Sequence, residues 1–145
     1  MVLDQLYQQA VLAHNREPKN AFVMTTATHS ALGNNALCSD ALQVYLEVFD
    51  DEIMRASFSG DACAIATASA SIMTEWLNGR STDEARAGAV AFENMLFGRP
   101  FDRDFIGESV LLQAVASFPS RIKSASLCWH AMIAALDGVA EISTE

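Results

Sequence analysis

The chain has 145 residues, a net charge of −9 and a composition that is 51% hydrophobic. This length suits one domain with its own core, and this hydrophobic content excludes a disordered chain. An acidic surface repels phosphate groups, so we expect neither a nucleic-acid partner nor a membrane partner. There is no apolar run of membrane-spanning length, and the N-terminal MVLD lacks the basic and apolar regions of a signal peptide. We therefore expect a cytoplasmic protein.

The first part of the chain predicts a helix followed by a hairpin. Apolar residues recur at helical spacing through residues 3–13. The Thr-rich run at 23–31 is interpreted as a strand, and the Gly- and Asn-rich run at 33–40 as a loop. Apolar and polar residues then alternate in two stretches, which predicts an antiparallel hairpin of residues 42–49 and 53–58.

The second part of the chain predicts a block of helices. The expected elements are a helix after the Gly60-Asp61 N-cap to about Asn78, a helix from the Ser81/Glu84 capping box to about Phe97, a loop at 99–105, a short helix at 107–116, and a last helix from Pro119 to about Asp137-Gly138. This order predicts a single α+β domain over residues 1–145, with a small antiparallel sheet and helices packed on one of its faces.

The three cysteines stand at positions that suggest chemistry. Cys38 precedes a predicted strand, with Asp40 two residues later, and Cys63 falls in the first turn of a predicted helix, where backbone N–H groups stabilise a thiolate. Cys128 lies in the last helix. Three thiolates and one carboxylate can form a tetrahedral zinc or iron site. Alternatively, each cysteine is a small buried hydrophobe, as is common in a reducing compartment.

Several motifs resemble those of the SufU-type iron–sulfur cluster assembly proteins, within the wider IscU/NifU-like scaffold family. The stretch NNALCSD is similar to the Asn-Pro-x-Cys-Gly-Asp loop of that family. FSGDACAIATASASIMT resembles its Phe-x-Gly-x-Gly-Cys segment with the following Ala-Ser-Ala-Ser run, and FPSRIKSASLCW its Phe-Pro-x-Arg-x-Lys-Cys segment. The resemblance covers nearly the whole chain.

The resemblance implies a scaffold or sulfur carrier rather than an enzyme. Its partners would be a cysteine desulfurase and the proteins that receive the cluster. Cys38 would accept sulfur, and Cys38, Asp40 and Cys63 would bind zinc or a transient iron–sulfur cluster. Arg121 and Lys123, near the start of the last helix, would favour anionic sulfur.

The chain departs from the family at the third cysteine, where Ser124 stands, while Cys128 lies four residues later. Positions i and i+4 are one helical turn apart, so Cys128 can serve as the missing ligand only by reaching back over Ser124. Ala36 and Ser39 replace a Pro and a Gly of the Cys38 loop, and Ala62 replaces the Gly before Cys63.

These departures leave alternatives open. Cys128 is either a displaced metal ligand or a packing residue. The chain is either a metal- or cluster-binding sulfur-transfer protein or a divergent relative without stable metal that acts through interaction or regulation. A third, weaker hypothesis is thiol redox chemistry between Cys38 and Cys63, although the sequence has no C-x-x-C pair.

Overall fold

The computed structural model describes residues 2–144, with side chains from Asp4 onward. Its helices are α1 (Val2–Arg16), α2 (Ala64–Leu77), α3 (Thr82–Leu96), α4 (Arg103–Ile106) and α5 (Pro119–Leu136), with 3-10 segments η1 (Ala36–Cys38) and η2 (Gly107–Val115). Its strands are β1 (His29–Asn35), β2 (Asp40–Phe49), β3 (Glu52–Asp61) and β4 (Glu141–Ser143), in the order β3-β2-β1-β4.

The predicted α+β class and the hairpin of β2 and β3 are confirmed, and one strand was missed. β1, β2 and β3 pair antiparallel, whereas β4 pairs parallel to β1, so the sheet is mixed. The Leu32 N–H donates to the Ala140 carbonyl at 2.9 Å, and the Thr144 N–H donates to the Asn34 carbonyl at 3.0 Å. The strand Glu141–Ser143 is too short to show an alternation of apolar and polar residues, so the sequence could not identify it. Only its backbone pairing with β1 defines it.

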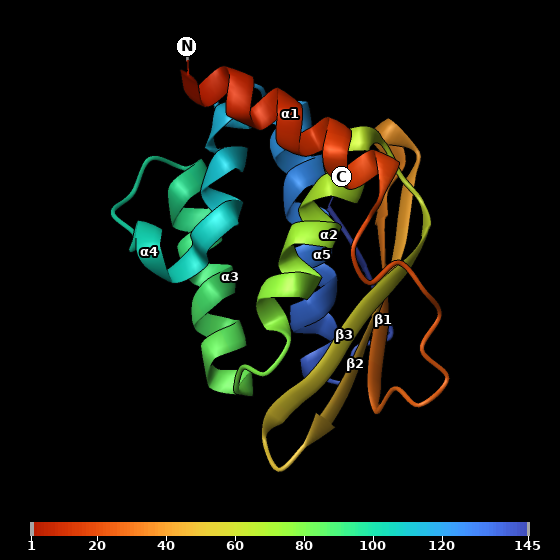
Figure 1. The fold of residues 1–145 in the computed structure, drawn as a ribbon. Coiled ribbons are helices and arrows are strands. Elements are labelled where there is room, and N and C mark those ends of the chain that lie inside the picture. Colours follow the sequence, from red (N-terminus) through yellow and green to blue (C-terminus); the bar gives the residue numbers. More distant parts are fainter. Residues whose placement is uncertain (1, 145) are drawn as a thin grey trace.

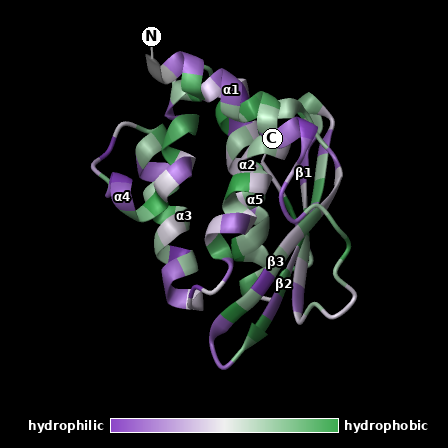
Figure 2. Cartoon of the chain, viewed as in Figure 1, coloured by the Kyte–Doolittle hydropathy of each residue, from purple (hydrophilic) through white to green (hydrophobic). Residues whose placement is uncertain are grey.

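The helices cover the sheet in layers (Figure 1). α5 packs on β1 and β2, α2 packs on α5 and β3, and α3 lies on the far side of α5. The loop at α4 and the tip of the β2–β3 hairpin are hydrophilic (Figure 2), which agrees with their place at the edges of the molecule. Among residues 2–144, no helix is long and apolar enough to cross a membrane.

The predicted strand at 23–31 was wrong over most of its length. β1 begins at His29 and continues through Gly33 to Asn35, which we expected to be loop. The alternation was hidden because the buried positions of β1 carry Ala31, Gly33 and Asn35 rather than large hydrophobes. Gly33 leaves room for α5, since a Cβ at this position would make a tight contact of 3.0 Å with Leu127 Cδ1 of that helix.

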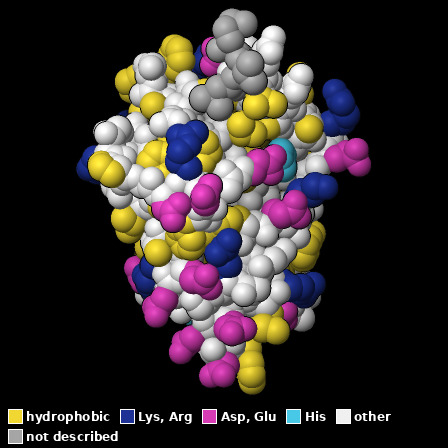
Figure 3. Space-filling view, turned by 60° about the vertical axis from the view of Figure 1, so that its left-hand side comes forward, with side chains coloured by type: hydrophobic (Ala, Val, Ile, Leu, Met, Phe, Trp, Pro, Cys, Tyr) yellow, Lys and Arg dark blue, Asp and Glu magenta, His cyan; other side chains and the backbone are white. Residues whose placement is uncertain are grey.

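The helical block largely follows the prediction. The Ser81/Glu84 capping box is present, and Pro119 opens α5. Part of the expected loop at 99–105 is the short helix α4, and the expected helix at 107–116 is the 3-10 segment η2. On the face formed by these elements, acidic side chains are spread widely and gather toward the lower end (Figure 3), as expected from the net charge of −9.

Gly88 lets α3 approach α2. Trp76 of α2 donates from Nε1 to the Phe105 carbonyl at 2.7 Å, and its ring packs against those of Phe105 and Trp129. A Cβ at Gly88 would lie 2.7 Å from Cζ3 of this fixed ring.

We therefore expect Gly88→Ala to destabilise the protein by about 1–3 kcal/mol, the typical cost of overpacking. Helix propensity alone would stabilise it by about 1 kcal/mol, so the sign of the change decides between the two effects. Chemical denaturation measures it. Ala87→Gly, on the exposed face of the same helix, gives the size of the propensity effect alone, and a more stable Gly88→Ala variant would contradict the packing.

Candidate functional site

Three elements meet at one end of the sheet, where β2 begins, α2 begins and α5 passes. Ala41 pairs with Asp61, so the chain leaves β3 directly beside the start of β2 and enters α2 there. Gly60 has φ +122°, and a Cβ at this position would collide with the Ala41 carbonyl. The close pairing of β2 and β3 therefore fixes where α2 starts relative to Asp40.

The Asp40 carboxylate is the centre of this junction. It is only 2% exposed. Its Oδ1 accepts a hydrogen bond from the Cys63 N–H at 2.7 Å. Its Oδ2 accepts a hydrogen bond from the Ser124 hydroxyl at 3.0 Å and faces the Cys63 thiol at 3.8 Å. Both carboxylate oxygens are thus occupied by donors of the protein itself.

Cys63 is the N-cap of α2 rather than a residue of its first turn, so the predicted cap at Gly60-Asp61 was two residues early. Its Sγ accepts a hydrogen bond from the Ala66 N–H at 3.4 Å. The N–H groups and the positive dipole end of the helix stabilise negative charge on a sulfur in this place. Cys63 is partly exposed.

Cys38 lies in the turn η1, immediately before β2, as the sequence predicted. It is partly exposed, and its neighbour Leu37 is 70% exposed. Ser39 has φ 57° and ψ 30°, and its N–H donates to the Ala36 carbonyl at 3.3 Å. Glycine adopts this left-handed conformation most readily, and Ser39 adopts it here although it is not glycine. The turn therefore has the shape expected for glycine with serine in its place.

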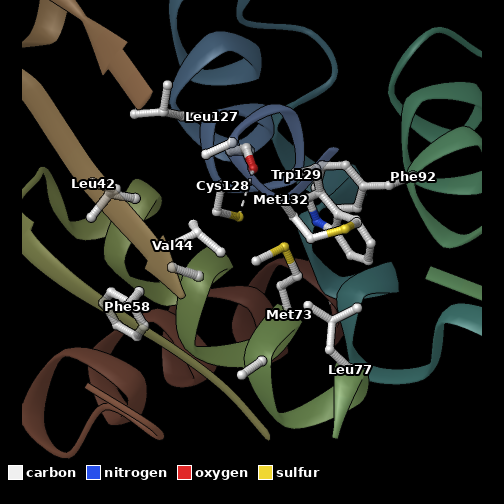
Figure 4. Packing of buried hydrophobic residues seen from close by; sticks show 14 of the residues in the cluster. Leu42, Val44, Phe58, Met73, Leu77, Phe92, Leu127, Cys128, Trp129 and Met132 are labelled. Carbon is white, nitrogen blue, oxygen red and sulfur yellow. Dashed lines mark hydrogen bonds between the residues drawn. The ribbon is translucent and has the colours of Figure 1, made fainter. Parts of the chain in front are cut away.

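Ser124 and Cys128 face different surroundings. Ser124 reaches Asp40, whereas Cys128 lies one turn further along α5 and is 0% exposed. The Cys128 thiol lies 3.4 Å from the Ser69 hydroxyl and donates to the Ala125 carbonyl at 3.8 Å. Figure 4 shows Cys128 among core side chains that include Val44 and Met73. Its position favours the packing interpretation over the displaced-ligand interpretation.

Burial raises the pKa of the Cys128 thiol to about 12, and the hydrogen bond with Ser69 offsets only part of this rise. A thiol of such a pKa is protonated at neutral pH in the metal-free protein, so a metal would have to displace this proton in order to bind there.

The two basic residues near the start of α5, Arg121 and Lys123, lie in different surroundings. The exposed Arg121 places its guanidinium 4.5 Å from the centre of the Phe118 ring. Burial raises the pKa of the Tyr7 phenol, the Arg121 charge opposes this rise, and Cys63 adds to it. Tyr7 therefore interacts electrostatically with Arg121 and with Cys63. Lys123 instead lines a hollow of about 440 Å³ together with Glu93 and His130.

Residues 6–125 match the family described as the NifU-like N terminal domain. The chain belongs to this family. It is 34% identical over 131 residues to the zinc-dependent sulfurtransferase SufU of Bacillus subtilis, and the aligned region covers 90% of this chain and 88% of that protein. It is 36% identical over 132 residues to the iron–sulfur cluster assembly scaffold protein IscU of Streptococcus pyogenes, covering 90% and 82%.

A solved structure has the same fold as this NifU-like domain. The crystal structure of the putative iron–sulfur cluster assembly scaffold protein for the SUF system of Fervidobacterium islandicum superposes with a TM-score of 0.86 at 28% identity. The match covers 91% of this chain and 97% of that one.

The side chains of this NifU-like domain do not fit a zinc ion held by four protein ligands. Within the described part of the chain, no three Cys, His, Asp or Glu side chains come together closely enough to hold a metal ion. Asp40 and Cys63 are adjacent, but the group beside them on α5 is the neutral Ser124 hydroxyl. The Asn35 carboxamide, paired across the sheet with Asp40, is buried without a hydrogen-bond partner. This end of the sheet therefore has polar capacity that a bound water or another small group would satisfy.

Sequence reasoning missed two roles. We treated Ser124 as a vacancy in the ligand set, although a serine facing a buried carboxylate is a natural donor. The burial of His14 was not predicted either: it lies 2.6 Å from the Ser71 hydroxyl and 3.1 Å from the Glu108 carboxylate. Since both partners are distant in sequence, only the fold reveals them.

The difference in burial predicts selective thiol labelling. Burial raises the pKa of the Cys128 thiol to about 12, so this thiol is protonated at pH 8. We expect iodoacetamide to modify Cys38 and Cys63 in the native protein and to leave Cys128 unmodified, as read by peptide mass spectrometry. In guanidinium chloride all three should react. Rapid native labelling of Cys128 would contradict its placement in the core.

Proposed function

We propose that the chain acts in iron–sulfur cluster assembly as a protein that accepts sulfur from a cysteine desulfurase and carries it on Cys38. The observation that carries this proposal is the place of Cys38. It lies in a partly exposed turn, next to the exposed Leu37, directly before the strand whose first residue, Asp40, meets Cys63. The names of the relatives, a sulfurtransferase and a cluster assembly scaffold, support the same role.

The chemical step is a transfer of sulfane sulfur between thiols. The Cys38 thiolate attacks the terminal sulfur of the desulfurase persulfide and forms a new S–S bond. The S–S bond to the desulfurase cysteine breaks, and that cysteine leaves as a thiolate. Such exchange is balanced without an added oxidant or reductant, and its rate depends on access to the attacking thiolate.

The carried sulfane sulfur, once reduced to sulfide by two electrons from an external donor such as a dithiol, would then contribute to a cluster, which is cargo rather than a resident cofactor. We propose Cys38, Asp40 and Cys63 as the residues that would hold the nascent cluster. Because these three side chains do not converge in this structure, the Cys38 turn must approach Asp40 and Cys63 for this. The start of α2, where the Ala66 N–H donates to Cys63 Sγ, favours anionic sulfur at Cys63. In this role the chain is a carrier or scaffold that works with the desulfurase and with cluster-accepting proteins.

A second candidate is a divergent relative without stable metal, acting through interaction or regulation. The observation that favours it is the hydrogen bond from Ser124 to Asp40, which stands where a further thiolate would complete a ligand set. The two candidates differ in whether sulfur reaches Cys38.

The test uses the full chain, a cysteine desulfurase and free cysteine, followed by mass spectrometry of the intact protein and its peptides. We expect one added sulfur on Cys38 and a loss of this product to the background level in Cys38→Ser. Cys128→Ser should keep the wild-type level, because Cys128 is buried away from the turn. Absence of added sulfur in the wild-type chain would favour the second candidate.

A further inference from the structure

We propose that Ser124 is the residue that determines metal affinity in this chain: it holds Asp40 by a hydrogen bond in place of a metal, so that the site binds zinc weakly and exchangeably. This inference deepens the proposed function, on which its biological meaning rests, and it assigns to Ser124 a positioning role.

The first step concerns geometry. Ser124 Oγ and Cys63 Sγ approach the same carboxylate oxygen, Asp40 Oδ2, at 3.0 and 3.8 Å, from α5 and from the start of α2. Side chains from three elements therefore converge on one point. A sulfur in place of the Ser124 oxygen would add a third Cys or Asp side chain to the two already in contact. Replacing the Ser124 oxygen by sulfur would thus give three side chains that converge, those of Asp40, Cys63 and residue 124.

The second step concerns donor chemistry. A neutral hydroxyl is a poor zinc ligand beside thiolate, imidazole or carboxylate, the groups that zinc binds in proteins. As a hydrogen-bond donor, however, the hydroxyl satisfies a buried carboxylate without any cation. Metal binding at Asp40 must displace the Ser124 hydrogen bond or compete with it, which lowers the net affinity.

The third step excludes the neighbouring thiol. Cys128 lies one turn from Ser124, is 0% exposed, and its hydrogen bonds go to Ser69 and the Ala125 carbonyl rather than to Asp40. A shift of one helical turn is about 5.4 Å, far beyond the tolerance of about 0.2 Å in a zinc–sulfur bond. Cys128 therefore does not replace the missing sulfur.

The test is a zinc competition titration against a chromophoric chelator, with Zn²⁺ as the only added ligand and no desulfurase present. We expect Ser124→Cys to bind one zinc ion at least about tenfold more tightly than the wild-type chain, a change within the range that altered metal surroundings produce. The Ser124→Cys/Cys63→Ser variant is the matched control and should lose the gain. With Co²⁺, Ser124→Cys should show stronger sulfur-to-cobalt charge-transfer absorption.

Cys128→Ser in the otherwise unchanged chain gives a second measurement that does not depend on the folding of Ser124→Cys. An unchanged zinc affinity supports the proposal. A loss of affinity in Cys128→Ser, or equal affinities of Ser124→Cys and wild type, would overturn it. Because this titration uses no sulfur transfer, its failure is distinguishable from failure of Cys38 to accept sulfur.

Discussion

The burial of the Asp40 carboxylate is the constraint on which the site depends. A carboxylate that is 2% exposed must be matched by donors or by a cation, since an unpaired buried charge is costly. Here the donors are the Cys63 N–H and the Ser124 hydroxyl. The same contacts join the start of β2 to the start of α2 and to α5. The Asp40 carboxylate therefore fixes the relative positions of these three elements.

Because of this arrangement, the junction around Asp40 is ordered without a bound metal. In a site whose ligands are all anionic, repulsion between them is relieved when a metal binds or when a ligand takes up a proton. With Ser124 as a neutral donor, the junction has internal partners before any metal or sulfur is present. The thiols of Cys38 and Cys63 remain partly exposed, while the Cys128 thiol is enclosed in the core. The chain thus keeps two partly exposed cysteines, one of them in contact with an ordered carboxylate, which suits the proposed role as a carrier that gains and releases its cargo.

The sequence allowed much of this to be predicted where local chemistry decides the structure. Alternation identified β2 and β3, and the Ser81/Glu84 pair identified the start of α3. It failed where tertiary contacts decide: β1 carries Gly33 because α5 approaches it, and β4 exists through its pairing alone. At the site, the positions of Cys38, Asp40 and Cys63 in the sequence identified them as candidate ligands. The partner of Asp40 on α5 could not be read, because choosing between Ser124 and Cys128 requires knowing the rotation of the helix.

The most direct measurement of the central interaction is a double-mutant cycle of Asp40→Asn and Ser124→Ala, with the free energy of unfolding measured in metal-free buffer. Residues that share a hydrogen bond to a charged group are expected to be coupled by about 1–3 kcal/mol. We predict a coupling energy in this range, so that the double variant is less destabilised than the sum of the single variants. Additive effects of the two substitutions would contradict the account, since they would mean that Ser124 does not hold Asp40.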